Sequence, residues 1–265
     1  TAASLDNAVE TEVAVVAAKT TTGGAGTGIN LLEATVLAVD TVASFSVNRV
    51  VADASVTTST SATVATLSDV VSAGDGNIVV QTTAGTLTLN DGTAADDDTA
   101  VSANGSGNIR LAALASGTDV LVNAQVLSGT GNITISGRRH VTFDGTGNVI
   151  VGAAAGTIFV EAVDGTIDQL STLTLQTDGA NIILAAKVDV KLGVVDARRN
   201  SDRTVGPLTL QSDGTTPWGD VGVTAVTGSI LDNKARDGTA RNVWARKLRL
   251  EAKTNIGLVD LTAAS

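Results

Sequence analysis

A short phrase recurs along the chain and constrains its fold more than any other feature. It consists of a glycine, an asparagine close behind it, and three to five residues that alternate between apolar and polar, as in GTGNITISG at 129–137. Glycine and asparagine tolerate a positive φ and can form sharp corners, whereas the alternation is typical of a short, half-buried β-strand. The phrase therefore predicts corners followed by strands, with Ile133 and Ile135 facing a core and Thr134 facing water. The five corner asparagines are Asn77, Asn108, Asn132, Asn148 and Asn181.

Two all-β architectures accommodate many short strands of this kind, a β-solenoid and an array of β-sandwiches. Aromatic residues make up only 2% of the chain, which contains 28 glycines, 2 prolines and no cysteine or methionine. A core of small aliphatic side chains suits a narrow, regular interior, and the likeness between the phrases favours stacked coils. We predict one β-solenoid segment over residues 1–265, with the sandwich array as the alternative. At about 20–25 residues a coil, the chain would make roughly 11–13 coils.

The repeats resemble those of a known class of proteins. The run GNIRLAALASGTDVLVNAQVLSGTGNI at 107–133, and the closing segment 228–257 with its GSI turn before a strand, are similar to the long repetitive regions of giant bacterial surface proteins, the β-helical adhesins of the filamentous-haemagglutinin type. This resemblance covers most of the chain. It implies a right-handed parallel β-helix in a secreted, cell-surface or fibrous protein, and it carries over no catalytic residue.

The same four residues, TAAS, stand at 1–4 and at 262–265. Their offset of 261 residues suggests a tandem repeat unit of about that length within a longer chain, whose neighbouring repeats would then be its first partners. No apolar run is long enough to span a membrane.

Charge is unevenly distributed. The net charge of −10 argues against nucleic-acid binding, yet residues 187–253 hold 12 of the 17 lysines and arginines. Lateral copies of a filament could associate by placing this basic zone against acidic residues of another copy. The arginines named for such self-association are Arg198, Arg199, Arg203, Arg236, Arg241 and Arg246.

Residues with catalytic or metal-binding chemistry are few. His140 is the single histidine, and a lone histidine at a strand start is more often a surface or corner residue than a base or a zinc ligand. Asp189, with Lys187 and Lys191, places opposite charges on a strand face but defines no catalytic set. A weak calcium candidate is the acidic loop NDGTAADDDTA at 90–100, although a solvated loop explains it as well. Its carboxylates are Asp91, Asp96, Asp97 and Asp98.

The sequence therefore predicts a non-catalytic structural repeat unit of a giant extracellular filament or cell-surface fibre, with no cofactor other than a possible calcium ion. Two alternatives stay open. One is an adhesin that presents a receptor- or carbohydrate-binding surface, for which Trp218 and Trp244 are the aromatic candidates. The other is a polysaccharide-active β-helix enzyme.

Overall fold

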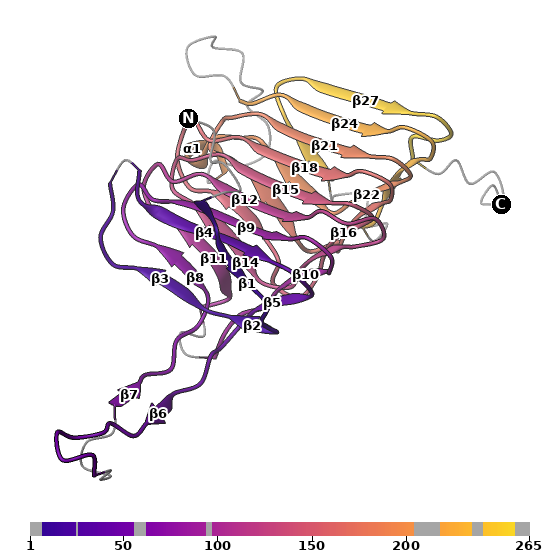
Figure 1. Ribbon diagram of the computed structural model, residues 1–265. Coiled ribbons are helices and arrows are strands. Elements are labelled where there is room, and N and C mark those ends of the chain that lie inside the picture. Colours follow the sequence, from indigo (N-terminus) through magenta and orange to yellow (C-terminus); the bar gives the residue numbers. More distant parts are fainter. Residues whose placement is uncertain are drawn as a thin grey trace.

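The computed structural model describes residues 7–24, 26–55, 62–93, 97–203, 218–234 and 241–257. Across these ranges the chain coils around one core, and successive coils build three parallel sheets, here named A, B and C (Figure 1). One coil shows the plan: β12 (Ile109–Ala113) lies in sheet A, β13 (Val120–Val122) in sheet B and β14 (Gln125–Ser128) in sheet C. The predicted parallel β-solenoid is confirmed.

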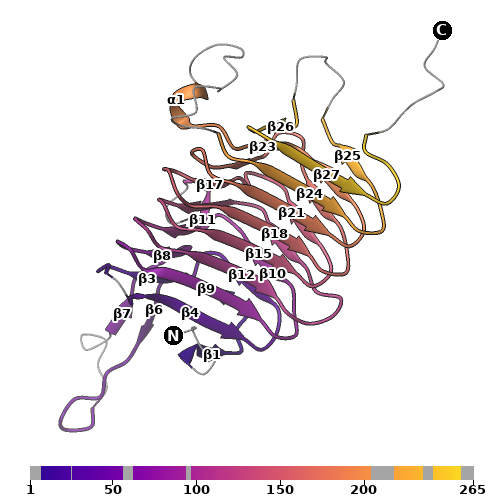
Figure 2. The ribbon, with the colours of Figure 1, turned by 90° about the horizontal axis from the view of Figure 1, so that it is seen from above.

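The sheets run the length of the coil stack (Figure 2). In spatial order, sheet A contains β1 (Val9–Thr11), β4 (Gly28–Glu33), β9 (Asn77–Thr82), β12, β15 (Ile133–Gly137), β18 (Ile158–Ala162), β21 (Ile182–Ala186), β24 (Val221–Ala225) and β27 (Leu248–Ala252). Sheet B contains β2 (Val15–Val16), β5 (Leu37–Val39), β10 (Leu87–Leu89), β13, β16 (Val141–Phe143), β19 (Ile167–Gln169), β22 (Val190–Leu192) and β25 (Ile230–Asp232). Sheet C contains β3 (Ala18–Thr20), β8 (Val70–Ser72), β11 (Thr99–Ala103), β14, β17 (Val149–Val151), β20 (Thr174–Gln176), β23 (Val194–Asp196) and β26 (Val243–Trp244).

The register stacks equivalent residues in columns along the interior. In sheet A, Ile109 pairs with Ile133, and Ile133 pairs with Ile158. The side chains of all three are buried, as is that of Ile135, whereas Thr134, between Ile133 and Ile135 along β15, is only partly covered. Each fully buried aliphatic side chain contributes about 1.5–3 kcal/mol to the free energy of folding. The inward and outward assignment of Ile133, Thr134 and Ile135 is therefore confirmed.

The phrase glycines act at two positions with different requirements. The first glycine takes a positive φ in three of the GxGN phrases, at Gly74, Gly105 and Gly145 with φ of 61°, 65° and 57°, which fits the expected corner, but Gly129 does not. The second allows neighbouring coils to touch: a Cβ on Gly131 would lie 2.0 Å from the carbonyl oxygen of Gly107. Asparagine does not supply a positive φ at any of the five phrase positions, so that part of the expected corner chemistry was wrong.

The number of coils differs from the expected 11–13. The described residues contain nine strands in sheet A, and therefore eight full coils and the start of a ninth. Coils of 24 or 25 residues do occur, as between Ile109, Ile133 and Ile158. Insertions lengthen other coils, so that Ile29 and Ile78 are neighbours in sheet A although 49 residues separate them. Nine strands at about 4.8 Å spacing give a stack about 38 Å long, shorter than 11–13 coils would make it.

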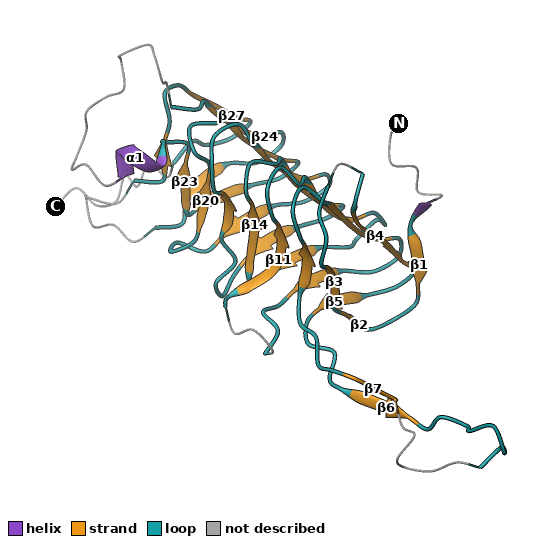
Figure 3. Ribbon diagram, turned by 90° about the vertical axis from the view of Figure 1, so that its left-hand side faces the viewer, coloured by secondary structure: helices purple, strands orange, loops and turns teal. Residues whose placement is uncertain are grey.

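The longest insertion is an arm that leaves the stack between β5 and β8. Its strands β6 (Phe45–Val47) and β7 (Ala62–Val64) form an antiparallel pair that projects away from the coils (Figure 3). One short helix, α1 (Asn200–Arg203), lies in the second long insertion. No helix within the described ranges is long and apolar enough to cross a membrane.

Candidate functional site

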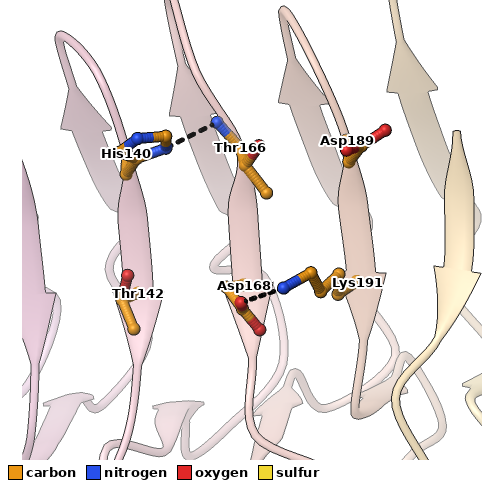
Figure 4. Close-up of a pocket in the computed structure, with 6 residues that line it drawn as sticks. All are labelled: His140, Thr142, Thr166, Asp168, Asp189 and Lys191. Carbon is orange, nitrogen blue, oxygen red and sulfur yellow. Dashed lines mark hydrogen bonds and ion pairs between the residues drawn. The ribbon is translucent and has the colours of Figure 1, made fainter. Parts of the chain in front are cut away.

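The outer face of sheet B carries a hollow of about 350 Å³ (Figure 4). Three neighbouring strands line it, because alternate residues of β16, β19 and β22 point away from the core. Thr142 pairs with Asp168 in the parallel register, and Asp168 pairs with Lys191. The hollow is lined by His140, Thr142, Thr166, Asp168, Asp189 and Lys191.

The polar groups of this hollow mostly contact neighbouring coils. The Thr166 amide donates a hydrogen bond to Nδ1 of His140 at 3.0 Å, and the Ser229 amide donates to Oδ1 of Asp189 at 2.7 Å. Because Nδ1 accepts this bond, the imidazole carries its proton on Nε2. Nζ of Lys191 lies 2.6 Å from Oδ2 of Asp168, and both side chains are more than a third exposed. An exposed pair of this kind adds only about 0–1 kcal/mol to stability.

This geometry defines what the hollow can do. General-base catalysis on a hydroxyl would need the imidazole within hydrogen-bond reach of that hydroxyl, whereas Nδ1 of His140 contacts a backbone amide. The Lys191 ammonium, the Thr142 hydroxyl and Nε2 of His140 are groups that can hold a polar ligand. Lys187, which the sequence grouped with Asp189 and Lys191, is not among the lining residues. The arrangement therefore supports binding more directly than catalysis.

The same kind of contact recurs at the corner that precedes sheet A. Oδ1 of Asn77 accepts hydrogen bonds from the amide (2.9 Å) and the side chain (3.2 Å) of Asn108. Oδ1 of Asn108 accepts the corresponding bonds from Asn132 at 2.8 and 3.0 Å. Asn132 then accepts bonds from the Thr157 amide and hydroxyl at 3.0 and 2.8 Å. These side chains form a ladder from one coil to the next.

The remaining two phrase asparagines lie elsewhere in the stack. Asn181 occupies the same corner two coils beyond Asn132, and its Oδ1 accepts from the Asp220 amide at 2.8 Å. Asn148 precedes a strand of sheet C, at a different corner, where its Oδ1 accepts from the Thr174 amide at 2.8 Å. All five asparagines thus contact the adjoining coil, but they do not form one column.

The acidic loop brings two of its carboxylates close to a third carboxylate, that of Asp69, which directly precedes strand β8 of sheet C. Asp91 and Asp97 lie close to Asp69, with one carboxylate oxygen of each within 4.8 Å of the others. Burial of Asp69, together with repulsion by Asp91, Asp97 and Asp40, raises its pKa to about 6, against a hydrogen bond from the Gly92 amide.

A divalent cation such as calcium takes six to eight oxygen ligands, and this cluster supplies three side chains toward such a set. Asp98, in the positive-φ region at 61°, is exposed and is not one of the three. Asp96 lies outside the described residues. Asp69, which the sequence did not single out, comes from a different coil and was therefore invisible to a search within one loop.

Several of the named arginines contact groups of their own chain. Arg198 and Arg203 lie 2.7 and 3.0 Å from Oδ2 of Asp196. Burial opposes ionisation of Asp196, but hydrogen bonds and charge from the two arginines outweigh it and lower its pKa. The Arg198 guanidinium also lies over the Trp244 ring, 3.8 Å from its centroid, an arrangement that favours a cation.

The other arginines are placed as follows. Arg246 pairs with Asp220 at 2.8 Å, and the Arg241 guanidinium lies 5.1 Å from the ring centroid of Trp244. Arg199 precedes α1, and its carbonyl oxygen accepts a hydrogen bond from the Asp202 amide. Arg236 lies outside the described residues. Lateral association through this group stays a prediction.

Glu33 and Gln169 are among the wholly buried polar residues, and the sequence analysis did not single them out. Glu33 accepts bonds from Thr11, Val13 and Thr35; burial alone would raise its pKa, but these bonds lower it. Gln169 is fully buried in sheet B's inward column. Each ends a strand that otherwise alternates normally, and the only signal in the sequence was a polar residue at an inward position. Trp218 is also buried, and its Nε1 donates to Asp202 at 2.7 Å.

No protein-family model matches the chain, and no match is found among curated proteins or solved structures. The function must therefore be argued from the geometry of the coil stack and its polar contacts.

Proposed function

We propose that this chain is a structural segment of a long extracellular or cell-surface fibre, and that its role is mechanical. The observation that carries the proposal is the ladder Asn77, Asn108 and Asn132, in which each side chain bonds the next coil. The extracellular setting rests on the resemblance of the repeats to giant surface proteins.

Two further features support a mechanical role. The interior columns are continuous along the stack, so that each coil contacts the one before and the one after. Chemically different corner residues, His140 and Asp189 among them, also hold amides of the following coil. In such a stack, stability is approximately a sum of contacts between nearest neighbours, so extension is resisted coil by coil.

Force spectroscopy on the chain, pulled from its two ends, tests this proposal. We expect the coils to unravel in successive steps. Replacing Asn108 and Asn132 with alanine should lower the force of the steps that release the central coils. Thr134→Ala, on the outer face of the same region, is the matched control and should leave those steps unchanged. Equal forces for the ladder variant and the control would contradict the proposal.

A second candidate function is supported by the hollow on sheet B. An adhesive surface that holds a polar or acidic oligosaccharide would use Lys191, Thr142 and Nε2 of His140 around its 350 Å³. Calorimetric titration with neutral and uronic-acid oligosaccharides tests it. Binding that is lost in Lys191→Met but kept in Lys187→Met, whose side chain lies outside the hollow, would support an adhesin. No heat with either sugar class would remove this candidate.

A further inference from the structure

The two ends of the described stack expose residues that belong to the interior columns. At the first coil, Val9 pairs with the buried Leu31 but is itself 62% exposed. At the last coil, Leu248 continues the column of Val221 and is 47% exposed. Ile256 bridges to the buried Ile230 and is 52% exposed. Both ends therefore present core surface that one more coil would cover.

The last coil also leaves a hollow that side chains of such a coil could fill. It measures about 340 Å³ and opens beside Ile230, Val243, Leu248, Leu250 and Ile256. Around it, the edge strands β26 and β27 each have one side with no neighbouring strand in the described stack, whereas the outer side of β25 carries only the bridge to Ile256. An unpaired strand edge is a template for another strand.

The opposite end has matching edges. Strands β1, β2 and β3 are the first strands of sheets A, B and C. They run parallel to the rest of their sheets, so an end of one stack can continue the sheets of another only in head-to-tail orientation. A two-fold contact between like ends would instead make the strands antiparallel.

Exposed acidic residues on the first coil and exposed basic residues on the last coil make the two ends complementary in a head-to-tail contact. Glu10 and Glu12 are exposed on the first coil, whereas Lys247, Arg249 and Lys253 are exposed on the last. The columns fix the register: Val9 pairs with Leu31, whose column continues to Leu250. If Val9 of one copy stacks on Leu250 of another, Glu12 comes beside Lys253. Glu10 comes beside Glu251, which is already paired with Arg249.

The arm gives an independent indication. It leaves the second coil and extends past the first coil, beyond the end of the stack, in all three views (Figures 1, 2 and 3). Phe45, Val47 and Val64 on its strands are 55%, 56% and 53% exposed. An isolated two-stranded hairpin is marginally stable in water, so this arm gains stability from any body stacked on the first coil.

We propose that copies of this segment stack head to tail, the first coil of one on the last coil of the next, with the β6–β7 arm against the side of the adjoining copy. Such a heterologous contact does not close on itself and generates an open filament. The inference builds on the proposed structural role, because it names the partner of the fibre segment as a second copy of the same chain.

The charge pair supplies the sharpest test. Glu12→Lys and Lys253→Glu are made separately in the full chain, and each is expected to weaken association by about tenfold, since like charges then meet at every contact. An equal mixture of the two variants should restore association, because each contact between unlike variants again joins a lysine to a glutamate. Sedimentation velocity over a range of protein concentrations measures this, and electron microscopy reports whether the particles are rods that lengthen end to end.

The apolar part of the contact has a matched control. Val9→Lys should shorten the rods, whereas Ile183→Lys, at a 49% exposed position on the outside of β21, should not. Circular dichroism confirms that both variants remain folded. Monomers at all concentrations, a closed dimer, or equal effects of the two lysines would overturn the inference, as would a mixture that associates no better than its parts. These outcomes are distinct from failure of the structural role, which the pulling experiment on single chains decides.

Discussion

Gln169 should be among the residues on which the stack most depends, although it contributes nothing to the surface. Its side chain fills the corner between sheets B and C inside the stack. Nε2 donates to the carbonyl oxygens of Leu173 at 2.7 Å and Val194 at 2.8 Å, and Oε1 accepts from the Gly193 amide at 3.1 Å. These partners belong to two successive coils, so one side chain joins both.

Replacing Gln169 with leucine keeps the volume but removes all three bonds. The Val194 carbonyl and the Gly193 amide then lose this partner in the interior, whereas the Leu173 carbonyl still accepts a hydrogen bond from the Val194 amide at 3.0 Å. Each of these two groups costs about 1–3 kcal/mol, so the free energy of opening around Gly193 should fall by about 2–6 kcal/mol. The loss should be local, because coils contact only their neighbours.

Amide hydrogen exchange resolved by residue is the appropriate assay. Protection should fall in β19, β20 and β23 and stay unchanged in β9 and β12. Phe143→Leu, in the same inward column one coil away, is the packing control and should cost about 1–1.5 kcal/mol. In Gln169→Glu, burial raises the pKa of the new carboxyl group. Below that pKa the protonated group still donates one hydrogen bond, so the stability of the variant should be greater there and should fall as the pH rises through the pKa. A loss in Gln169→Leu no larger than that in Phe143→Leu would refute the reasoning.

Three further outcomes are expected. Asn108→Ala removes bonds to two coils at an exposed corner and should lower the local opening free energy by about 1–2 kcal/mol in hydrogen exchange, with Thr134→Ala near zero. The pKa of Asp69 is about 6 in the folded chain against an ordinary 3.8, so its contribution to stability is greatest below pH 3.8 and is lost as the pH rises through 6. Asp69→Asn should remove this pH dependence and raise the free energy of unfolding by about 1–3 kcal/mol at pH 7, measured by urea unfolding. The pKa of Glu33 is lowered instead, so its contribution is present above pH 4.5 and is lost in acid; Glu33→Gln should flatten the acid limb of the same unfolding profile, and an unchanged limb would contradict the assignment.

Much of this fold follows from the alternation of side chains along short segments. Ile133 and Ile135 could be placed in the core because a strand with one buried face must alternate. The parallel stacking could be predicted because the phrases repeat, and repeated phrases place like residues in neighbouring coils. Both inferences use local information that every coil contains.

The length of individual coils was not predictable in the same way. The arm that contains Phe45 and Val64 interrupts a coil without changing the pattern on either side, so dividing the chain by an average coil length overcounted the coils. Asn148 shows a related limit. Its phrase reads like those of Asn108 and Asn132, but it starts a strand of a different sheet. Sequence alone indicates a corner and does not say which corner.

The corner before sheet B shows why residue type is a poor guide to chemistry in this fold. The Asp119 amide donates to Oγ1 of Thr86 at 3.3 Å, the His140 amide to Oδ1 of Asp119 at 3.0 Å, and the Thr166 amide to Nδ1 of His140 at 3.0 Å. A hydroxyl, a carboxylate and an imidazole thus make the same contact on successive coils. The position requires only an acceptor that reaches the next amide, and several side chains meet that requirement. The single histidine of the chain is therefore accounted for by its place in the stack, and a catalytic role would need a second contact made by Nε2.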